Sequence, residues 1–347
     1  MLPVVFLVTG MVFYVLWRIF AIFSISPSKW ILLLIALLFS WCAMFTIWYW
    51  GENLFLTISW TVFCWLFVLS FLLFLFLGVE HIISHWYKIN PWIVVGVFIC
   101  VLWLWNFFSL HTKVLDLEIH SDKLERDLNI LLVSDIHADY IFSTYHLKTI
   151  GKLIEEKHPD IVLIAGDLLN RPHMGYVDAY RYFRDHDFWV PIYAIMGNHD
   201  VLGSTDIYSK ISEISPIHFL DNESVIVDWI QLVWIIDKSI WWNWDLQNNL
   251  EATNMDKSWE FYTIFLTHQP MALEKIKDYP IDLEVAWHTH RGQFYWFRKL
   301  VEVMNDYGYW KFEEDWKIAF VTQGIWTWGL PFRLWTQSEA VMIHLKK

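Results

Sequence analysis

Five apolar runs in the second half of the chain each lead into side chains that bind metal ions. The runs are LNILLV, IVLIA, IYAIM, YTIFL and LEVA, and their branched residues are typical of buried strands. The polar side chains that follow are two acids, one amide and four imidazoles: Asp135, His137, Asp167, Asn198, His268, His288 and His290. Strands of this kind converge at one edge of a sheet, where α/β folds build their active sites. Mixed oxygen and nitrogen donors suit divalent transition metals such as Mn, Fe or Zn.

The order of these motifs resembles that of the calcineurin-like metallophosphoesterases. The motifs are Asp135-x-His137, Gly166-Asp167, Gly197-Asn198-His199-Asp200, His268-x-Pro270 and His288-Thr289-His290. The segment Gly324–Arg333 is similar to the tail of the membrane-associated bacterial branch of that family. A single His is more often a core or surface residue, by roughly five to one. Five motifs in family order reverse those odds, and the resemblance covers residues 128–347.

The resemblance implies two divalent metal ions and a phosphoesterase reaction. It places Asp167 as the carboxylate that bridges the ions, which direct a shared hydroxide at phosphorus. It assigns Asp135, His137 and His290 to one ion, and Asn198, His268 and His288 to the other. His199 is implied as the catalytic acid that protonates the leaving oxygen, or as a donor to phosphoryl oxygens. Asp200 is expected to be structural.

Three positions depart from the family pattern. Asn170 stands where many relatives carry an Asp that orients the catalytic histidine, and its amide can still accept a hydrogen bond from imidazole. Arg291 replaces a usual Gly, and it either contacts the phosphate of the substrate or faces solvent. Trp287 also replaces a Gly, directly before a ligand and where backbone must pass close to the site.

Tryptophan is unusually frequent, with 25 Trp against 13 Gly in 347 residues. Several Trp fall where turn chemistry or the resemblance asks for Gly: Trp234, Trp241, Trp242, Trp244, Trp287, Trp326 and Trp335. One hypothesis is that their codon is UGA, which specifies Gly in some bacterial lineages. The alternative is a truly Trp-rich protein. Trp328 resembles a genuine Trp of the family, so the hypothesis does not extend to every position.

The first 112 residues predict a transmembrane region of four helices. Apolar stretches of spanning length run over 2–23, 30–50, 54–78 and 91–110. A soluble helical bundle fits poorly because none of the four has a polar face. A cleaved signal peptide is disfavoured because three more apolar stretches follow at once. Arg18 is expected to reach the interface as an anchor.

Four spans place both termini on one side of a cell membrane. Arg18, Lys29 and Lys88 lie near the first and third loops, so the positive-inside rule leans toward an extracytoplasmic catalytic domain. The remaining 235 residues hold 22 Lys and Arg against 35 Asp and Glu, a net charge of −13. An acidic domain without a basic run is a poor nucleic-acid partner.

The predicted catalytic half begins with alternating strands and helices and ends rich in strands. Strands are expected at 128–135, 160–165, 191–196, 224–236, 261–267, 283–287, 317–323 and 338–345, and helices at 145–157, 175–185, 204–213 and 271–277. This pattern fits two mixed β-sheets packed face to face with helices outside. It is the four-layer αββα sandwich that the resemblance implies. The expected domains are therefore a transmembrane region at 1–112, a charged connector at 113–127 and a metallophosphoesterase domain at 128–347.

Three functions compete at this stage. The first is a membrane-anchored phosphoesterase that hydrolyses phosphomonoesters or phosphodiesters, with the bilayer as a partner. The second is a degenerate member of the fold that binds or scaffolds without turnover, which Asn170 and a true Trp287 favour. The third is a transporter subunit, which the lack of buried acids and paired charges in the spans disfavours. Membrane proximity fits a lipid-linked or envelope-derived phosphate ester, but it equally fits simple tethering.

Overall fold

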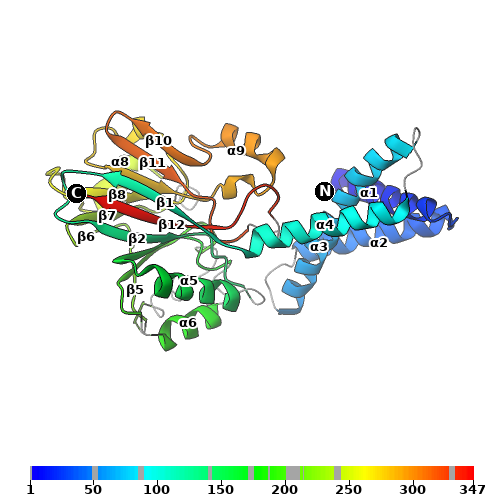
Figure 1. Cartoon of the computed structure of the whole chain (residues 1–347), viewed down its shortest axis with the longest axis horizontal. Coiled ribbons are helices and arrows are strands. Elements are labelled where there is room, and N and C mark those ends of the chain that lie inside the picture. The colour runs from blue at the N-terminus through cyan, green and yellow to red at the C-terminus, as the bar shows by residue number, and fades with distance from the viewer. Residues whose placement is uncertain are drawn as a thin grey trace. The chain divides into compact units, whose positions relative to one another are not determined.

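A computed structural model describes residues 2–48, 54–84, 90–139, 143–170, 176–186, 188–200, 212–213, 215–237, 244–327 and 333–347. The chain divides into two compact units, of which the second begins at Phe108 (Figure 1). Most of the helix expected at 204–213, and Trp241 and Trp242, lie outside the described residues.

Unit 1 consists of helices at the four predicted positions. They are α1 (Leu2–Ile22), α2 (Lys29–Trp48), α3 (Leu54–Ser84) and α4 (Pro91–Leu110), the last of which ends in unit 2. Within the described residues, one helical stretch, Trp92–Leu110, is long and apolar enough to cross a membrane, with a mean hydropathy of 2.3 over its best window. The apolar stretches found in the other three are shorter, at Phe6–Ile22, Lys29–Cys42 and Leu73–Ser84. The structure therefore confirms helices at the four predicted positions, but it does not confirm that all four span a membrane.

Helices α1 and α3 share a buried ion pair that the sequence did not predict. Helix α3 continues past the expected end at residue 78, so Glu80 lies on it. The Arg18 guanidinium donates to both carboxylate oxygens of Glu80, at 2.8 and 2.9 Å, and to Ser84 Oγ at 2.9 Å. The two charged side chains are only 13% and 7% exposed. Arg18 is thus a buried partner of an acid, and its expected role as an interface anchor stays a prediction.

Unit 2 contains two six-stranded sheets. The first has the order β1-β12-β2-β3-β4-β5. Its strands are β1 (Lys113–His120), β12 (Glu339–Lys346), β2 (Leu128–Val133), β3 (Ile161–Ala165), β4 (Ile192–Ile195) and β5 (Ile217–Phe219). All neighbours are parallel except β12 and β2, so the sheet is mixed, as predicted.

The second sheet has the order β10-β11-β9-β8-β7-β6. Its strands are β10 (Trp310–Glu314), β11 (Lys317–Val321), β9 (Leu283–Ala286), β8 (Tyr262–Leu266), β7 (Ile230–Trp234) and β6 (Ser224–Val227). The four inner strands are parallel, and β10 and β6 pair antiparallel at the edges. The single strand expected over 224–236 is a hairpin, β6 and β7, closed by Asp228 and Trp229.

The two sheets share one apolar core, to which Ile130 of β2, Ile264 of β8 and Val285 of β9 all contribute. Helices α5 (Ser143–Lys157) and α6 (Tyr176–Asp185) lie side by side beneath the first sheet in Figure 1. A smaller core covers the second sheet through α8 (Leu246–Ala252) and the 3₁₀ helix η1 (Leu273–Ile276), which replaces the helix expected at 271–277. These four layers match the predicted sandwich.

The connector expected at 113–127 needs correction. Residues Lys113–His120 form β1, which pairs with β12 along eight residues at the edge of the first sheet. Its sequence, KVLDLEIH, carries charges on its exposed positions. An exposed edge strand of this composition resembles a charged loop in sequence, because its partner β12 lies more than 200 residues away.

Candidate metal centre

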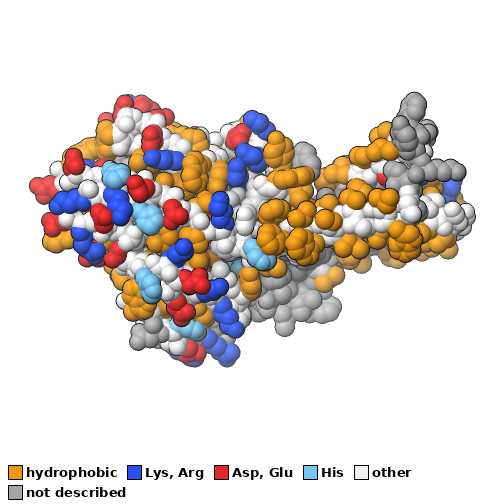
Figure 2. Space-filling view, in the orientation of Figure 1, with side chains coloured by type: hydrophobic (Ala, Val, Ile, Leu, Met, Phe, Trp, Pro, Cys, Tyr) orange, Lys and Arg blue, Asp and Glu red, His pale blue; other side chains and the backbone are white. Residues whose placement is uncertain are grey.

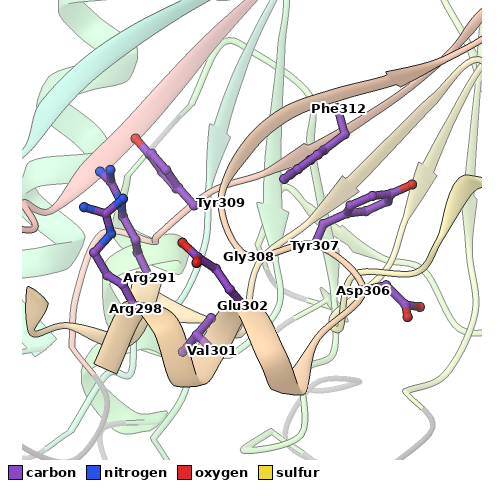
Figure 3. Close-up of a pocket in the computed structure, with 9 residues that line it drawn as sticks. All are labelled: Arg291, Arg298, Val301, Glu302, Asp306, Tyr307, Gly308, Tyr309 and Phe312. Carbon is purple, nitrogen blue, oxygen red and sulfur yellow. The ribbon is translucent and has the colours of Figure 1, made fainter. Parts of the chain in front are cut away.

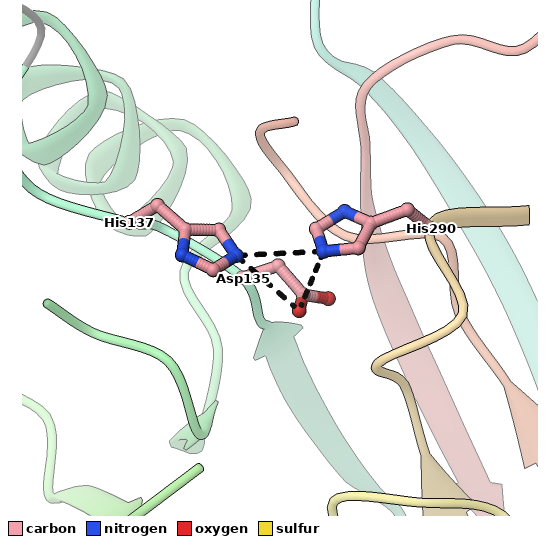
Figure 4. Close-up of side chains that lie close together, drawn as sticks. All are labelled: Asp135, His137 and His290. Atoms are coloured by element: carbon pink, nitrogen blue, oxygen red, sulfur yellow. Dashed lines mark hydrogen bonds and ion pairs between the residues drawn. The ribbon is translucent and has the colours of Figure 1, made fainter. Parts of the chain in front are cut away.

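Asp135, His137 and His290 form one group of converging donors. The His290 Nε2 atom lies 3.3 Å from Asp135 Oδ1 and 3.4 Å from His137 Nε2 (Figure 4). The separation between His137 Nε2 and Asp135 Oδ1 is 3.9 Å. All three side chains are buried, and Asp135 Oδ1 accepts no hydrogen bond. Three lone-pair donors that face one another in a buried space are what a metal ion requires.

Asp167 lies between this group and the next. Its Oδ2 atom is 3.7 Å from His137 Nε2 and also 3.7 Å from His268 Nε2. Its other oxygen, Oδ1, accepts a hydrogen bond of 2.9 Å from the backbone N–H of His199. One carboxylate oxygen therefore faces imidazoles from both sheets, since His137 follows β2 and His268 follows β8.

Asn198, His268 and His288 form the second group. The His268 Nε2 atom lies 2.5 Å from Asn198 Oδ1 and 2.8 Å from His288 Nδ1. Each of the three follows the carboxyl end of a parallel strand, β4, β8 or β9. The structure thus brings all seven predicted ligands together at one edge of the two sheets.

Burial sets the protonation preferences of these groups. It raises the pKa of Asp135 to about 7, an effect that the Ser134 hydroxyl and the Arg333 charge oppose. It raises the pKa of Asp167 well above the usual value, with Asp200 and Asp135 adding to the effect. Burial also lowers the pKa values of His137, His268 and His290 well below the usual one. Neutral imidazoles offer lone pairs, and two buried carboxylates with raised pKa values favour a nearby cation, so the donor set fits divalent cations.

Most of the predicted ligands have an unusual backbone conformation. Five of the seven have positive φ: Asp135 at 51°, His137 at 44°, Asp167 at 49°, His288 at 64° and His290 at 45°. Asp and His tolerate this region better than most residues, yet each such position costs on the order of 1–3 kcal/mol. Strain of this kind persists only where the surrounding structure enforces it, and it concentrates at functional sites.

His199 lies beside the two groups, and the main chain holds its ring. The His199 Nδ1 atom is 3.0 Å from the backbone carbonyl oxygen of Asn170. The ring of His199 stands edge-on to that of His137, with centroids 4.7 Å apart. The expected contact was with the Asn170 side chain, whereas the observed contact is with its backbone. A backbone carbonyl is the same whether residue 170 is Asn or Asp, so the departure at this position does not remove the contact.

Asp200 supports the turn rather than the ions. Its carboxylate accepts hydrogen bonds of 2.9 Å from the backbone N–H groups of Gly197 and Leu169, and a longer one from Leu168. These bonds tie the loop after β4 to the loop after β3. The side chain is fully buried, as its structural role requires.

Arg291 lines a cavity of about 270 Å³ beside the second sheet (Figure 3). Its guanidinium lies 3.9 Å from the centre of the Tyr309 ring. Figure 3 shows Arg298, from the following helix, reaching the same end of the cavity. Because Arg291 follows His290 directly, the cavity begins one residue from the metal centre. Of the two roles considered for Arg291, this position favours contact with a substrate.

Two residues at the centre were not predicted individually. Arg333 is fully buried, and it donates 2.6 Å to the carbonyl of Gln323 and 3.3 Å to that of His290. Gly324 has a φ of 76°, and a Cβ there would lie 2.4 Å from Asp135 Oδ2. Both lie in the Gly324–Arg333 segment, so its resemblance to the family tail was the available signal.

Trp287 lies within the site rather than away from it. Its indole is fully buried, and its ring centroid is 5.7 Å from that of the ligand His268. A Cβ added at Gly166 would lie 3.0 Å from the indole, and the Trp287 Nε1 atom has no hydrogen-bond partner. Positive φ occurs at His288 and not at Trp287. The backbone at Trp287 is therefore outside the left-handed region, and the indole fills the space behind the ligands.

A fold of two mixed sheets with acids, an amide and imidazoles at one edge is that of the metallophosphoesterase class. The family described as calcineurin-like phosphoesterase matches residues 128–319, and the chain belongs to it.

Curated relatives carry related names. An uncharacterized metallophosphoesterase of Helicobacter pylori is 26% identical over 264 residues, which cover 72% of this chain and 70% of the relative. An uncharacterized metallophosphoesterase of Campylobacter jejuni is 26% identical over 268 residues, covering 73% and 68%. A zebrafish (Danio rerio) transmembrane protein with metallophosphoesterase domain is 29% identical over 255 residues, covering 68% of this chain and 57% of the relative.

Proposed function

We propose that the chain is a membrane-anchored phosphoesterase that uses two divalent metal ions to hydrolyse phosphomonoester or phosphodiester bonds. The observation that supports this most directly is the position of Asp167, whose Oδ2 is 3.7 Å from imidazole nitrogens of both donor groups. A two-metal phosphoesterase needs one carboxylate that serves two ions about 3.5–4 Å apart.

Each residue of the site has its own role in the proposed reaction. Asp135, His137 and His290 hold one ion, Asn198, His268 and His288 hold the other, and Asp167 joins them. When bound, the ions supply an activated water and neutralise charge on the phosphoryl group. His199 acts as an imidazolium: its Nδ1–H donates a hydrogen bond to the Asn170 carbonyl oxygen, which orients the ring, and its Nε2–H proton passes to the leaving oxygen. Arg291 adds a positive charge at the entrance of the cavity that receives the leaving group.

Membrane anchoring is the second part of the proposal. Trp92–Leu110 has the length and composition of a membrane span, and it ends two residues before β1. The visible face of unit 1 is mostly hydrophobic (Figure 2). The zebrafish relative and one from cattle (Bos taurus) are named as transmembrane proteins. We propose that α1, α2 and α3 accompany α4 in the bilayer as a four-helix, multi-pass region.

A degenerate protein that binds metal without turnover is the alternative, and Trp287 favours it. The buried indole takes up space beside His268. Two measurements on the purified full-length protein test this alternative. Bound metal distinguishes it from a protein that lacks the metal centre. Absence of hydrolysis in an activity assay distinguishes it from an enzyme.

The metal prediction rests on which ions each ligand serves. We expect two divalent ions per chain, loss of both in Asp167→Ala and loss of about one in Asn198→Ala, because the carboxylate serves both ions and the amide serves one. Elemental analysis of the purified protein measures this. Asp221→Ala, at an exposed position, is the control and should keep both ions. One ion in the unaltered protein, or no loss in Asp167→Ala, would contradict the assignment.

Hydrolysis of bis-p-nitrophenyl phosphate and of p-nitrophenyl phosphate tests activity and bond type. The proposed enzyme hydrolyses at least one of them. A chelator abolishes the rate of hydrolysis, and addition of Mn²⁺, Fe²⁺ or Zn²⁺ restores it. Full metal occupancy without hydrolysis of either compound would favour the degenerate alternative.

A further inference from the structure

Helix α9 (Arg298–Met304) exposes its apolar side chains to solvent. Leu300 is 51% exposed, Val303 83% and Met304 73%, and no residue of the helix is buried. The spacing of these three, at positions i, i+3 and i+4, places them on one face. In a surface helix of a soluble protein, such a face packs against the core.

Aromatic side chains extend this face beyond the helix. Phe297 precedes Leu300 by three residues and is 50% exposed. Tyr295 and Trp335 are 55% and 61% exposed, and their ring centroids are 6.2 Å apart. We call this set the α9 surface: Tyr295, Phe297, Leu300, Val303, Met304 and Trp335. Contiguous exposed apolar area of this kind marks an interaction site.

A basic side chain borders the α9 surface. Lys299 lies on the first turn of the helix, its side chain is 90% exposed, and it pairs with Glu302 at 3.3 Å. Arg298, on the same turn, lines the cavity. Figure 2 shows basic, acidic and hydrophobic side chains next to one another over α9. Aliphatic, aromatic and basic side chains on one short amphipathic element are typical of helices that lie at the surface of a bilayer. The Lys299 side chain suits the anionic headgroups of lipids.

The α9 surface lies close in the chain to the segment that joins α4 to unit 2. Ser338 donates hydrogen bonds to the carbonyl oxygens of Phe108 and Ser109, at 3.0 and 2.6 Å. The Gln337 side chain donates to the carbonyl of His111 at 3.0 Å. Trp335 precedes Ser338 by only three residues, which span at most about 11 Å. The end of the candidate span is therefore held near the α9 surface within unit 2 itself.

We propose that the α9 surface docks onto the lipid bilayer, with the apolar side chains at the acyl boundary and Lys299 among the headgroups. The opposite side of α9 lines the cavity next to Arg291, through Arg298, Val301 and Glu302. Docking therefore holds the cavity about one helix diameter from the membrane surface, within reach of a phosphate ester carried by a lipid. This inference rests on the membrane anchoring in the proposed function.

The test uses the full-length chain in lipid nanodiscs that contain phosphatidylglycerol and doxyl-labelled phosphatidylcholine. Cys42, Cys64 and Cys100 are first replaced by Ser. A bimane label is then attached in separate proteins at Val303→Cys, at Leu300→Cys, at the exposed control Lys152→Cys on α5, and at Trp103→Cys in α4. We expect the lipid quencher to reduce bimane fluorescence at 303, 300 and 103 by at least twofold and to leave 152 unchanged.

Each other outcome counts against the inference. Quenching at 103 without quenching at 303 and 300 overturns docking while leaving membrane anchoring in place. Absence of quenching at 103 as well removes the anchoring, and docking with it. Equal quenching at 152 shows contact without a preferred face. A bimane shift at 303 that grows with protein concentration and is insensitive to the quencher assigns the surface to a second copy of the chain.

Discussion

The five predicted ligands with positive φ show how this centre is built at the scale of single residues. In an extended strand, successive side chains point to opposite faces of the sheet. The left-handed conformation at Asp135 and Asp167 turns the backbone directly after β2 and β3, so both carboxylates point toward the second sheet. The cost in backbone strain is offset by the rest of the fold, in which Gly197 and Gly324 leave room for Asp167 and Asp135.

The role of His199 leads to a prediction about leaving groups. His199→Ala should retain two ions, because other side chains hold them, and should lose turnover by roughly 10²–10⁴-fold for alkyl esters. The loss should be smaller for nitrophenyl esters, whose leaving oxygen needs little protonation. Steady-state kinetics across leaving groups of different pKa measures this. His158→Ala, at an exposed position, should behave like the unaltered protein. Equal losses for all leaving groups would reduce His199 to a phosphate-binding or structural residue.

Four Trp residues with positive φ provide a structural test of the hypothesis that some Trp codons are UGA and specify Gly. Trp229, Trp259, Trp310 and Trp335 have φ values of 59–80°. Asp228 and Trp229 form the two-residue loop between β6 and β7, and both have positive φ. A two-residue hairpin loop of this kind strongly favours Asp-Gly. Trp335 was already among the suspected positions, whereas Trp229 was not.

Trp229→Gly should therefore raise the stability of the protein. The expected gain is about 1–2 kcal/mol, because a left-handed conformation costs a bulky residue this much and costs Gly little. Thermal unfolding measures the change. Trp189→Gly is the matched control, since Trp189 is also exposed but has an ordinary backbone, and it should bring no gain. Peptide mass spectrometry of the native protein should find Gly at 229, and UGG codons there would exclude the hypothesis.

At the scale of elements, the sequence predicted the strands that carry ligands, together with β7, β11 and β12, and missed β1, β5 and β10. Strands β2, β3, β8 and β9 are continuous apolar runs, because both faces of each strand are buried. Edge strands β1 and β10 are half polar, and β1 pairs with β12, which is distant in sequence, whereas β10 pairs with the next strand, β11. Helix α9 escaped prediction because it has only 7 residues, too few for a helical period to stand out in the sequence.

The ion pair between α1 and α3 gives a prediction about stability. Glu80→Gln leaves the Arg18 guanidinium buried without a charged partner and should destabilise the protein by about 3–5 kcal/mol. The double substitution Arg18→Met with Glu80→Leu should recover most of this loss, since apolar side chains of similar volume replace a buried pair well. Thermal unfolding in detergent provides the measurement, with Glu156→Gln on an exposed face of α5 as control. A Glu80→Gln protein as stable as the unaltered one would show that water solvates the pair.

At the scale of the whole molecule, the side of the membrane occupied by unit 2 is a prediction from charge. The basic residues near the first and third loops favour an extracytoplasmic position. In a background without native cysteines, Glu223→Cys lies at an exposed site of unit 2. A membrane-impermeant maleimide should label it in intact cells as strongly as after permeabilisation. Labelling only after permeabilisation would place the domain in the cytoplasm.

The position of β12 determines when the metal centre can be completed during biosynthesis. Strand β12 lies between β1 and β2, pairing with eight and five residues, and its Glu339 accepts hydrogen bonds from Thr322 and Gln323 beside the ligands. Until residues 339–346 leave the ribosome, β1 has no neighbour and the first sheet is open. Under the proposed membrane anchoring, the apolar helices have by then entered the membrane. The centre therefore matures after insertion, and it takes its ions from the compartment in which unit 2 finishes folding.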